Sequence, residues 1–170
     1  MKKITVALLS FFLLSCVSVP ENVEPVSGFE LNKYTGKWYE IARLDHGFER
    51  DLEKVSATYS INDDGSVRVV NKGLSIKNQQ WQEAVGKAKF VRDENTGFLK
   101  VSFFGPFYGS YVIFDLDKEN YQYAFVTGGK NYLWLLSRTP TISEELKNKF
   151  LRVSKEAGYN VDELIFVNQE

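Results

Sequence analysis

Gly97-Phe98-Leu99-Lys100-Val101-Ser102-Phe103-Phe104 alternates between apolar and polar side chains. Successive side chains of an extended chain point to opposite faces, so Leu99, Val101 and Phe103 fall on one side and polar residues on the other. A period of two predicts a β-strand with one buried face. Residues 66–75 show the same alternation. The chain is therefore expected to contain several short strands.

Clusters of turn-forming residues separate these runs, because Gly and Asn tolerate the positive φ of tight reversals. The clusters are Asn62-Asp63-Asp64-Gly65, Asn95-Thr96-Gly97, Lys118-Glu119-Asn120 and Gly128-Gly129-Lys130-Asn131. The predicted strands cover residues 37–46, 54–62, 66–75, 80–92, 97–104, 108–116, 120–127 and 131–137. Eight antiparallel strands connected in order predict an all-β fold, an eight-stranded up-and-down β-barrel with room for one small ligand. A two-sheet sandwich is the alternative.

One amphipathic helix is expected at residues 143–157, where Leu146, Phe150 and Val153 share a face. Its expected place is outside the barrel, against the strand at 131–137, which is apolar on both faces. Residues 164–167 predict a short ninth strand.

The N-terminus predicts export. Two lysines precede an apolar run over residues 4–14, which is about half as long as a membrane-spanning helix. Residues 1–15 therefore predict a signal peptide. Residues 16–28 mix Pro, Gly, Ser and acidic side chains and predict a tether. The folded domain is then expected at residues 29–170.

The composition disfavours several classes of function. The formal net charge is −1, so nothing favours nucleic acid as a partner. The chain has one histidine, His46, and one cysteine, Cys16. His46 lies in a predicted loop and Cys16 is expected to be lipidated, so a catalytic Cys–His pair and a His/Cys metal cluster are not expected. We expect no catalytic residues, no metal site and no cofactor.

Three elements resemble the conserved regions of lipocalins. They are Gly36-Lys37-Trp38-Tyr39-Glu40 in the first predicted strand, Asp117 before the turn at 118–120, and Arg138 after the eighth strand. In lipocalins the second region is commonly Thr-Asp-Tyr, so only Asp117 carries over there. The resemblance implies a barrel whose floor Trp38 closes, with Arg138 packed across it. Gly36, Trp38, Asp117 and Arg138 are then structural residues.

Leu13-Leu14-Ser15-Cys16 resembles the lipobox of bacterial lipoproteins. The resemblance implies that the Cys16 thiol takes a diacylglycerol, that the chain is cut before it, and that its new amino group is acylated by a fatty acid such as palmitate. Val17 stands where an Asp signals retention in the inner membrane. A lipid-anchored protein of the outer membrane is therefore implied, with its barrel facing the periplasm.

Residues 38–43, 101–109 and 135–141 resemble the bacterial outer-membrane lipocalins. That resemblance implies a membrane-anchored carrier that binds and transports fatty acids or lysophospholipids, is sometimes a homodimer, and is often linked to envelope stress. From the alternation and the resemblance we predict that the ligand contacts Ala42, Tyr59, Val69, Ala88, Phe90, Val101, Phe103, Tyr111, Phe125 and Leu133. An error of one residue in register would invert the prediction for a whole strand.

Two loops are candidates for ligand or partner contacts. Residues 45–51 form the first long loop, where Arg43 and Arg50 can meet a phosphate or carboxylate, or simply carry solvated charge. Residues 103–108 join two strands and contain four aromatic side chains, which suits a pocket rim, a dimer contact or a membrane-dipping loop.

A structural or stress-related envelope lipoprotein without a specific ligand is the alternative function. Its barrel would be filled by side chains. The small residues Ala84, Gly86 and Ala88 argue against a filled barrel, although large side chains from a neighbouring strand can occupy the space they leave.

Overall fold

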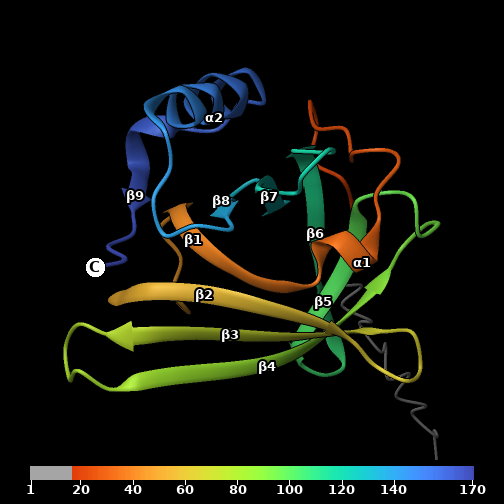
Figure 1. The fold of residues 1–170 in the computed structure, drawn as a ribbon, viewed down its shortest axis with the longest axis horizontal. Coiled ribbons are helices and arrows are strands. Elements are labelled where there is room, and N and C mark those ends of the chain that lie inside the picture. The colour runs from red at the N-terminus through yellow and green to blue at the C-terminus, as the bar shows by residue number, and fades with distance from the viewer. Residues whose placement is uncertain (1–16) are drawn as a thin grey trace, which may run out of the picture.

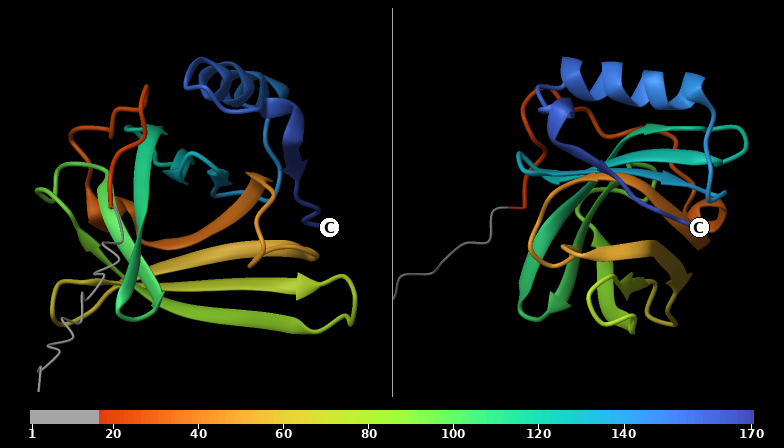
Figure 2. Two further views of the ribbon diagram at one scale, coloured as in Figure 1. Left: turned by 180° about the vertical axis from the view of Figure 1, so that it is seen from behind. Right: turned by 90° about the vertical axis from the view of Figure 1, so that its left-hand side faces the viewer.

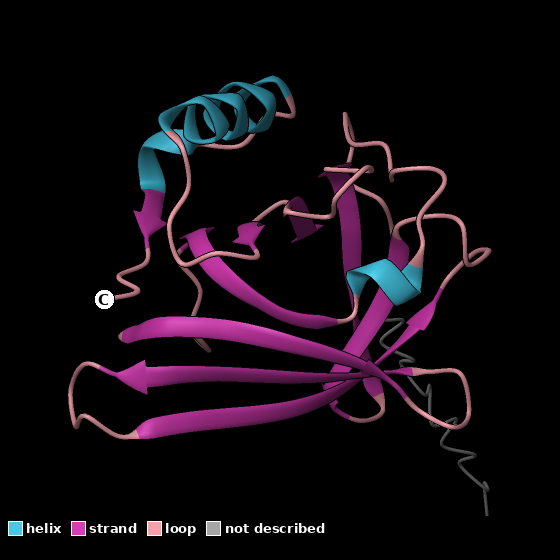
Figure 3. Ribbon diagram, in the orientation of Figure 1, coloured by secondary structure: helices cyan, strands magenta, loops and turns pink. Residues whose placement is uncertain are grey.

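A computed structural model describes residues 17–170; the predicted signal peptide and Cys16 lie outside this range. Figure 1 shows the order of the elements, and Figure 3 shows that strands dominate. The helices are α1 (Leu31–Tyr34), α2 (Glu144–Glu156) and the short 3-10 helix η1 (Val161–Glu163). The strands are β1 (Gly36–Leu44), β2 (Leu52–Ile61), β3 (Val67–Ser75), β4 (Trp81–Phe90), β5 (Phe98–Phe104), β6 (Phe107–Leu116), β7 (Tyr123–Gly129), β8 (Tyr132–Ser137) and β9 (Leu164–Phe166).

Strands β1 to β8 form a closed antiparallel up-and-down barrel, which confirms the predicted fold and excludes the sandwich. Each strand pairs with the next, β8 pairs with β1, and the pairing of Gly36–Tyr39 with Ser56–Tyr59 closes the barrel between β1 and β2. We call one end of the barrel the mouth. It is formed by the connections at residues 45–51, 76–80, 105–106 and 130–131. The other end, which α1 covers, is the floor (Figure 1).

The floor is closed by Trp38, which is fully buried. The guanidinium carbon of Arg138 lies 3.9 Å from the Trp38 ring centroid, the cation-over-ring contact that the resemblance implied. The same guanidinium donates hydrogen bonds to the carbonyls of Lys33, Lys37 and Tyr121. Arg138 therefore ties α1, β1 and the β6–β7 turn together beneath the barrel.

Asp117 holds the β6–β7 turn, since its carboxylate accepts hydrogen bonds from the backbone N–H groups of residues 119, 120 and 122. This turn reaches Tyr121, which has a positive φ of 54°. Strand β7 therefore begins at Tyr123 rather than at residue 120 as predicted.

A β-bulge between Glu40 and Ala42 changes the course of β1. Beyond the bulge β2 no longer pairs with β1, and β9 takes its place, with Ala42 opposite Phe166. The side-chain amide of Gln169 donates to the carbonyls of Glu40 and Val55, on β1 and β2. The C-terminal residues therefore close the gap between these two strands.

Helix α2 packs outside the barrel, as predicted (Figure 2). Ser143 caps its N-terminus by accepting a hydrogen bond from Leu146 N–H. Phe150 is fully buried beneath the helix, with its ring centroid 4.9 Å from that of Phe125 on β7. The outer face of β7 and β8 is therefore as apolar as the inner one.

Residues 17–28 lie along the barrel, whereas the sequence predicted a tether. Val26 N–H donates to the Ile113 carbonyl, and its own carbonyl accepts from Gly97 N–H. Nearer the N-terminus, Ser18 exchanges two hydrogen bonds with the hydroxyl of Ser110 on β6. Composition favoured a loose linker, but hydrogen bonds to β6 and to Gly97, just before β5, fix this segment in place.

Candidate functional site

The barrel encloses a cavity of about 290 Å³ between the mouth and the floor. Residues from all eight barrel strands line it, together with α1 and the loop at residues 45–51. Most of the lining side chains are aliphatic or aromatic. A cavity of this kind takes an apolar ligand or the apolar part of an amphiphile.

Six of the ten predicted ligand contacts line this cavity. They are Tyr59, Val69, Ala88, Val101, Phe103 and Tyr111, on strands β2 to β6. These strands have one apolar and one polar face, so the alternation identifies the inner face.

The other four predicted residues, Ala42, Phe90, Phe125 and Leu133, do not line the cavity. Phe125 and Leu133 are buried on the outer face beneath α2, and Val126 and Trp134 line the cavity in their place. Both faces of β7 and β8 are apolar, so alternation does not distinguish them.

Ala42 also packs on the outer face, because the bulge after Glu40 reverses the alternation on β1. Phe90 lies at the floor, where its ring meets Phe29 edge-on with a centroid distance of 6.1 Å.

The small residues of β4 have different environments. Ala88 lines the cavity, but Ala84 is exposed. A Cβ atom added at Gly86 would lie 2.9 Å from the Phe103 ring. The space left by Gly86 is thus occupied by Phe103, and the void that remains lies nearer Ala88.

Three tyrosines form a hydrogen-bonded group at the floor side of the cavity. The Tyr111 hydroxyl lies 2.7 Å from that of Tyr34 and 2.8 Å from that of Tyr59. Burial raises the pKa of all three phenols, so they stay neutral. Three hydroxyl hydrogens serve two hydrogen bonds, so one hydrogen remains for a ligand oxygen.

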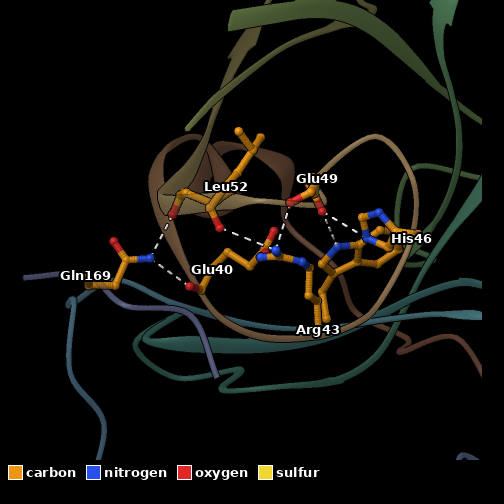
Figure 4. A network of polar contacts seen from close by, with 8 residues as sticks. Glu40, Arg43, His46, Glu49, Leu52 and Gln169 are labelled. Carbon is orange, nitrogen blue, oxygen red and sulfur yellow. Dashed lines mark hydrogen bonds and ion pairs between the residues drawn. The ribbon is translucent and has the colours of Figure 1, made fainter. Parts of the chain in front are cut away.

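A charged cluster lies in the wall on the mouth side (Figure 4). Arg43 is buried, although a solvated charge was the simpler reading of its sequence position. Its guanidinium donates to the Glu40 carboxylate at 2.8 Å and to the carbonyls of Glu49 and Leu52. The bulge in β1 turns this side chain inward, and the loop at residues 45–51 closes over it.

Glu49 holds that loop against the barrel. Its carboxylate accepts a hydrogen bond from the Trp134 indole at 3.1 Å and lies 2.9 Å from His46 Nε2. Burial, and next the Glu49 carboxylate, raise the pKa of Glu40 well above its ordinary value. Glu40 and Glu49 both line the cavity and give its wall two carboxyl groups on the mouth side.

Arg50 lies outside this cluster. Its exposed guanidinium pairs with Asp45 at 2.7 Å, which matches the solvated-charge alternative. The sequence pattern does not show which of the two arginines is buried. Arg43 is buried because the carbonyls of Glu49 and Leu52 accept its hydrogen bonds, and a pattern of side chains does not reveal backbone partners.

No group of three or more His, Cys, Asp and Glu side chains in residues 17–170 is arranged to hold a metal ion. None of the helices in the described part of the chain has the length and apolar character that a membrane span requires.

Comparison with known proteins gives consistent matches. A family model described as a lipocalin-like domain matches residues 29–169. The outer membrane lipoprotein Blc of Vibrio cholerae is 55% identical over 171 residues, covering 100% of both chains. Blc of Escherichia coli K12 is 48% identical, covering 98% of this chain and 95% of that one. Insecticyanin from the tobacco hornworm Manduca sexta has a similar structure, with a TM-score of 0.69 at 21% identity, covering 86% of this chain and 84% of its own.

Proposed function

This chain belongs to the lipocalin family, and we propose that it is an outer membrane lipoprotein whose barrel binds and transports fatty acids or lysophospholipids. The cavity of about 290 Å³ is the observation that carries the proposal. Burial of an acyl chain there is favourable by roughly 0.8 kcal/mol per methylene, before the cost of ordering the ligand.

The polar groups of the cavity suit an amphiphile. The spare hydroxyl hydrogen of Tyr34, Tyr59 and Tyr111 can meet a carbonyl or carboxylate oxygen at the floor. The carboxyl groups of Glu40 and Glu49 lie toward the mouth and suit the ammonium group of a zwitterionic headgroup. Lipocalins are generally binding proteins.

Native mass spectrometry tests lipid binding. The mature domain with Cys16→Ser, purified without detergent, is titrated with lysophospholipid and with fatty acid. We expect a saturable one-to-one complex that Ala88→Trp abolishes, because the indole fills the cavity. Val85→Trp, on the exposed outer face of the same strand, should keep the complex. If the folded parent forms no complex with either lipid, the structural lipoprotein without a ligand becomes the better explanation.

The lipid anchor at Cys16 is supported by the lipobox and by relatives that are named outer membrane lipoproteins. The full-length parent should incorporate labelled palmitate, and Cys16→Ser should abolish that incorporation. A parent that takes up no label would exclude acylation at Cys16.

A further inference from the structure

We propose that the mouth of the barrel docks directly on the surface of the lipid bilayer through five exposed apolar side chains. This mouth ring consists of Phe48, Ile76, Trp81, Phe104 and Phe107. The inference rests on the proposed function, because it assigns the membrane that carries the anchor as the partner of this surface.

The exposure of these side chains is concentrated at one end of the molecule. Phe104 is 81% exposed, Phe107 65%, Phe48 59%, Ile76 55% and Trp81 54%. No other large hydrophobic side chain in residues 17–170 has more than half of its surface exposed. Single exposed apolar residues are ordinary on protein surfaces, but a group confined to one end marks an interaction site.

The five residues come from three separate connections around the cavity entrance. Phe48 lies in the loop at residues 45–51, where its ring stacks on the His46 ring with the two centroids 4.0 Å apart. Ile76 and Trp81 border the β3–β4 turn, which projects at the left of Figure 1. Phe104 and Phe107 face each other across the β5–β6 turn. Aromatic side chains of this kind favour the boundary between headgroups and acyl chains.

Charge contributes little to this surface. The connections at the mouth carry three acidic residues, Asp45, Glu49 and Asp51, and three basic ones, Arg50, Lys77 and Lys130. Arg50 is paired with Asp45. The docking is therefore driven by apolar burial and should change little with salt, unlike the attachment of a basic patch to anionic lipids.

The path of the N-terminal segment identifies the bilayer as the partner. From Val26, which bonds to Ile113, this segment runs back to Ser18, which bonds to Ser110 and so lies nearer the β5–β6 turn. Ser110 is three residues from Phe107, about 10 Å along the strand. Cys16 is two positions before Ser18, which adds at most about 7 Å. Ser18 therefore lies toward the β5–β6 turn, and an anchor on Cys16 is within reach of a bilayer that Phe104 and Phe107 contact.

The consequence is a direct route for the ligand. With the mouth ring on the bilayer, the cavity opens onto the same leaflet that holds the acyl anchor. A lipid can then enter the barrel without its chain crossing water.

Vesicle binding without the anchor tests the proposal. The mature domain with Cys16→Ser is sedimented with vesicles of phosphatidylethanolamine and phosphatidylglycerol. The double variant Phe104→Ser/Phe107→Ser should lower vesicle partitioning about tenfold. The matched control, Ile61→Ser/Val91→Ser, removes exposed apolar side chains at the floor end and should bind as the parent does. Lipids brominated on their acyl chains should quench Trp81 fluorescence, and Trp81→Phe should remove most of that quenching.

Three results would overturn the docking proposal. They are a parent domain that does not bind vesicles, equal binding by the two double variants, and binding that high salt abolishes. Light scattering tests the other use of the surface: if Phe104→Ser/Phe107→Ser turns a dimer into a monomer and leaves vesicle binding unchanged, the ring is a dimer contact. Native titration with lysophospholipid is run on every variant, so that loss of docking and loss of ligand binding are measured separately.

Discussion

Glu40 is a buried carboxyl group whose titration the fold changes. Burial and the Glu49 carboxylate raise its pKa well above the ordinary 4.5, so the folded protein holds its proton more tightly than the unfolded chain does. The stabilising contribution of Glu40 is therefore complete below pH 4.5 and is lost as the pH rises through the raised pKa.

Glu40→Gln should remove this loss of stability. The amide keeps an oxygen for Arg43 and has no proton to release. The free energy of unfolding of the variant, relative to the parent, should rise with pH from 4.5 upward, at most by about 1.4 kcal/mol per pH unit. Urea unfolding at several pH values measures this difference, with the exposed Glu83→Gln as control. Parallel curves for the parent and Glu40→Gln would show that Glu40 titrates as it does in the unfolded chain.

Three of the residues that sequence reasoning missed at the cavity lie outside regular strands with one polar face. Glu40, Glu49 and Trp134 line it because a bulge, a loop and a strand with two apolar faces determine their direction. Alternation reports only on regular strands with one polar face, such as β3 and β5. The burial of Arg43 was missed for the same reason.

At the scale of elements, α2 depends on one aromatic contact. Phe150 is fully buried against Phe125, and both lie between the helix and the barrel. Phe150→Ala should lower the free energy of unfolding by about 3–5 kcal/mol, because it leaves a cavity at this interface.

Chemical denaturation measures the effect of Phe150→Ala. The same change at the exposed Phe107 should stay within about 0.5 kcal/mol of the parent. Equal effects of the two substitutions would mean that α2 contributes little to the stability of the barrel.

The order of the elements was predictable from the sequence. Alternating runs and turn clusters together placed all eight strands, and the spacing of Leu146, Phe150 and Val153 placed α2. Helix α1 was not predicted, because four residues are too few to show a helical period.

At the scale of the whole molecule, the segment at residues 17–28 acts as a strap across β5 and β6. Composition alone indicated a tether. The hydrogen bonds that hold the strap are to residues far along the chain, and the local sequence does not reveal such partners. Removal of residues 16–27 should lower the free energy of unfolding by about 3 kcal/mol, through the loss of buried Val23 and of the hydrogen bonds of Ser18 and Val26.

Thermal and urea unfolding of this truncated domain, compared with the Cys16→Ser domain, measure the effect of the strap. Val23→Ser in the longer chain isolates the apolar part of the loss. If the truncated domain is as stable as the longer one, the segment contributes nothing to stability and behaves as the tether that composition predicted.

The bond from Gln169 to the Glu40 carbonyl joins residues 129 positions apart. The predicted signal peptide exports the chain before it folds, and β1 emerges well before the residue that seals it to β2. During that time the edge of β1 that β8 will occupy has no partner, and an unpaired strand edge is a template for aggregation. A chain that emerges into the periplasm therefore keeps this edge open until its C-terminal part has followed.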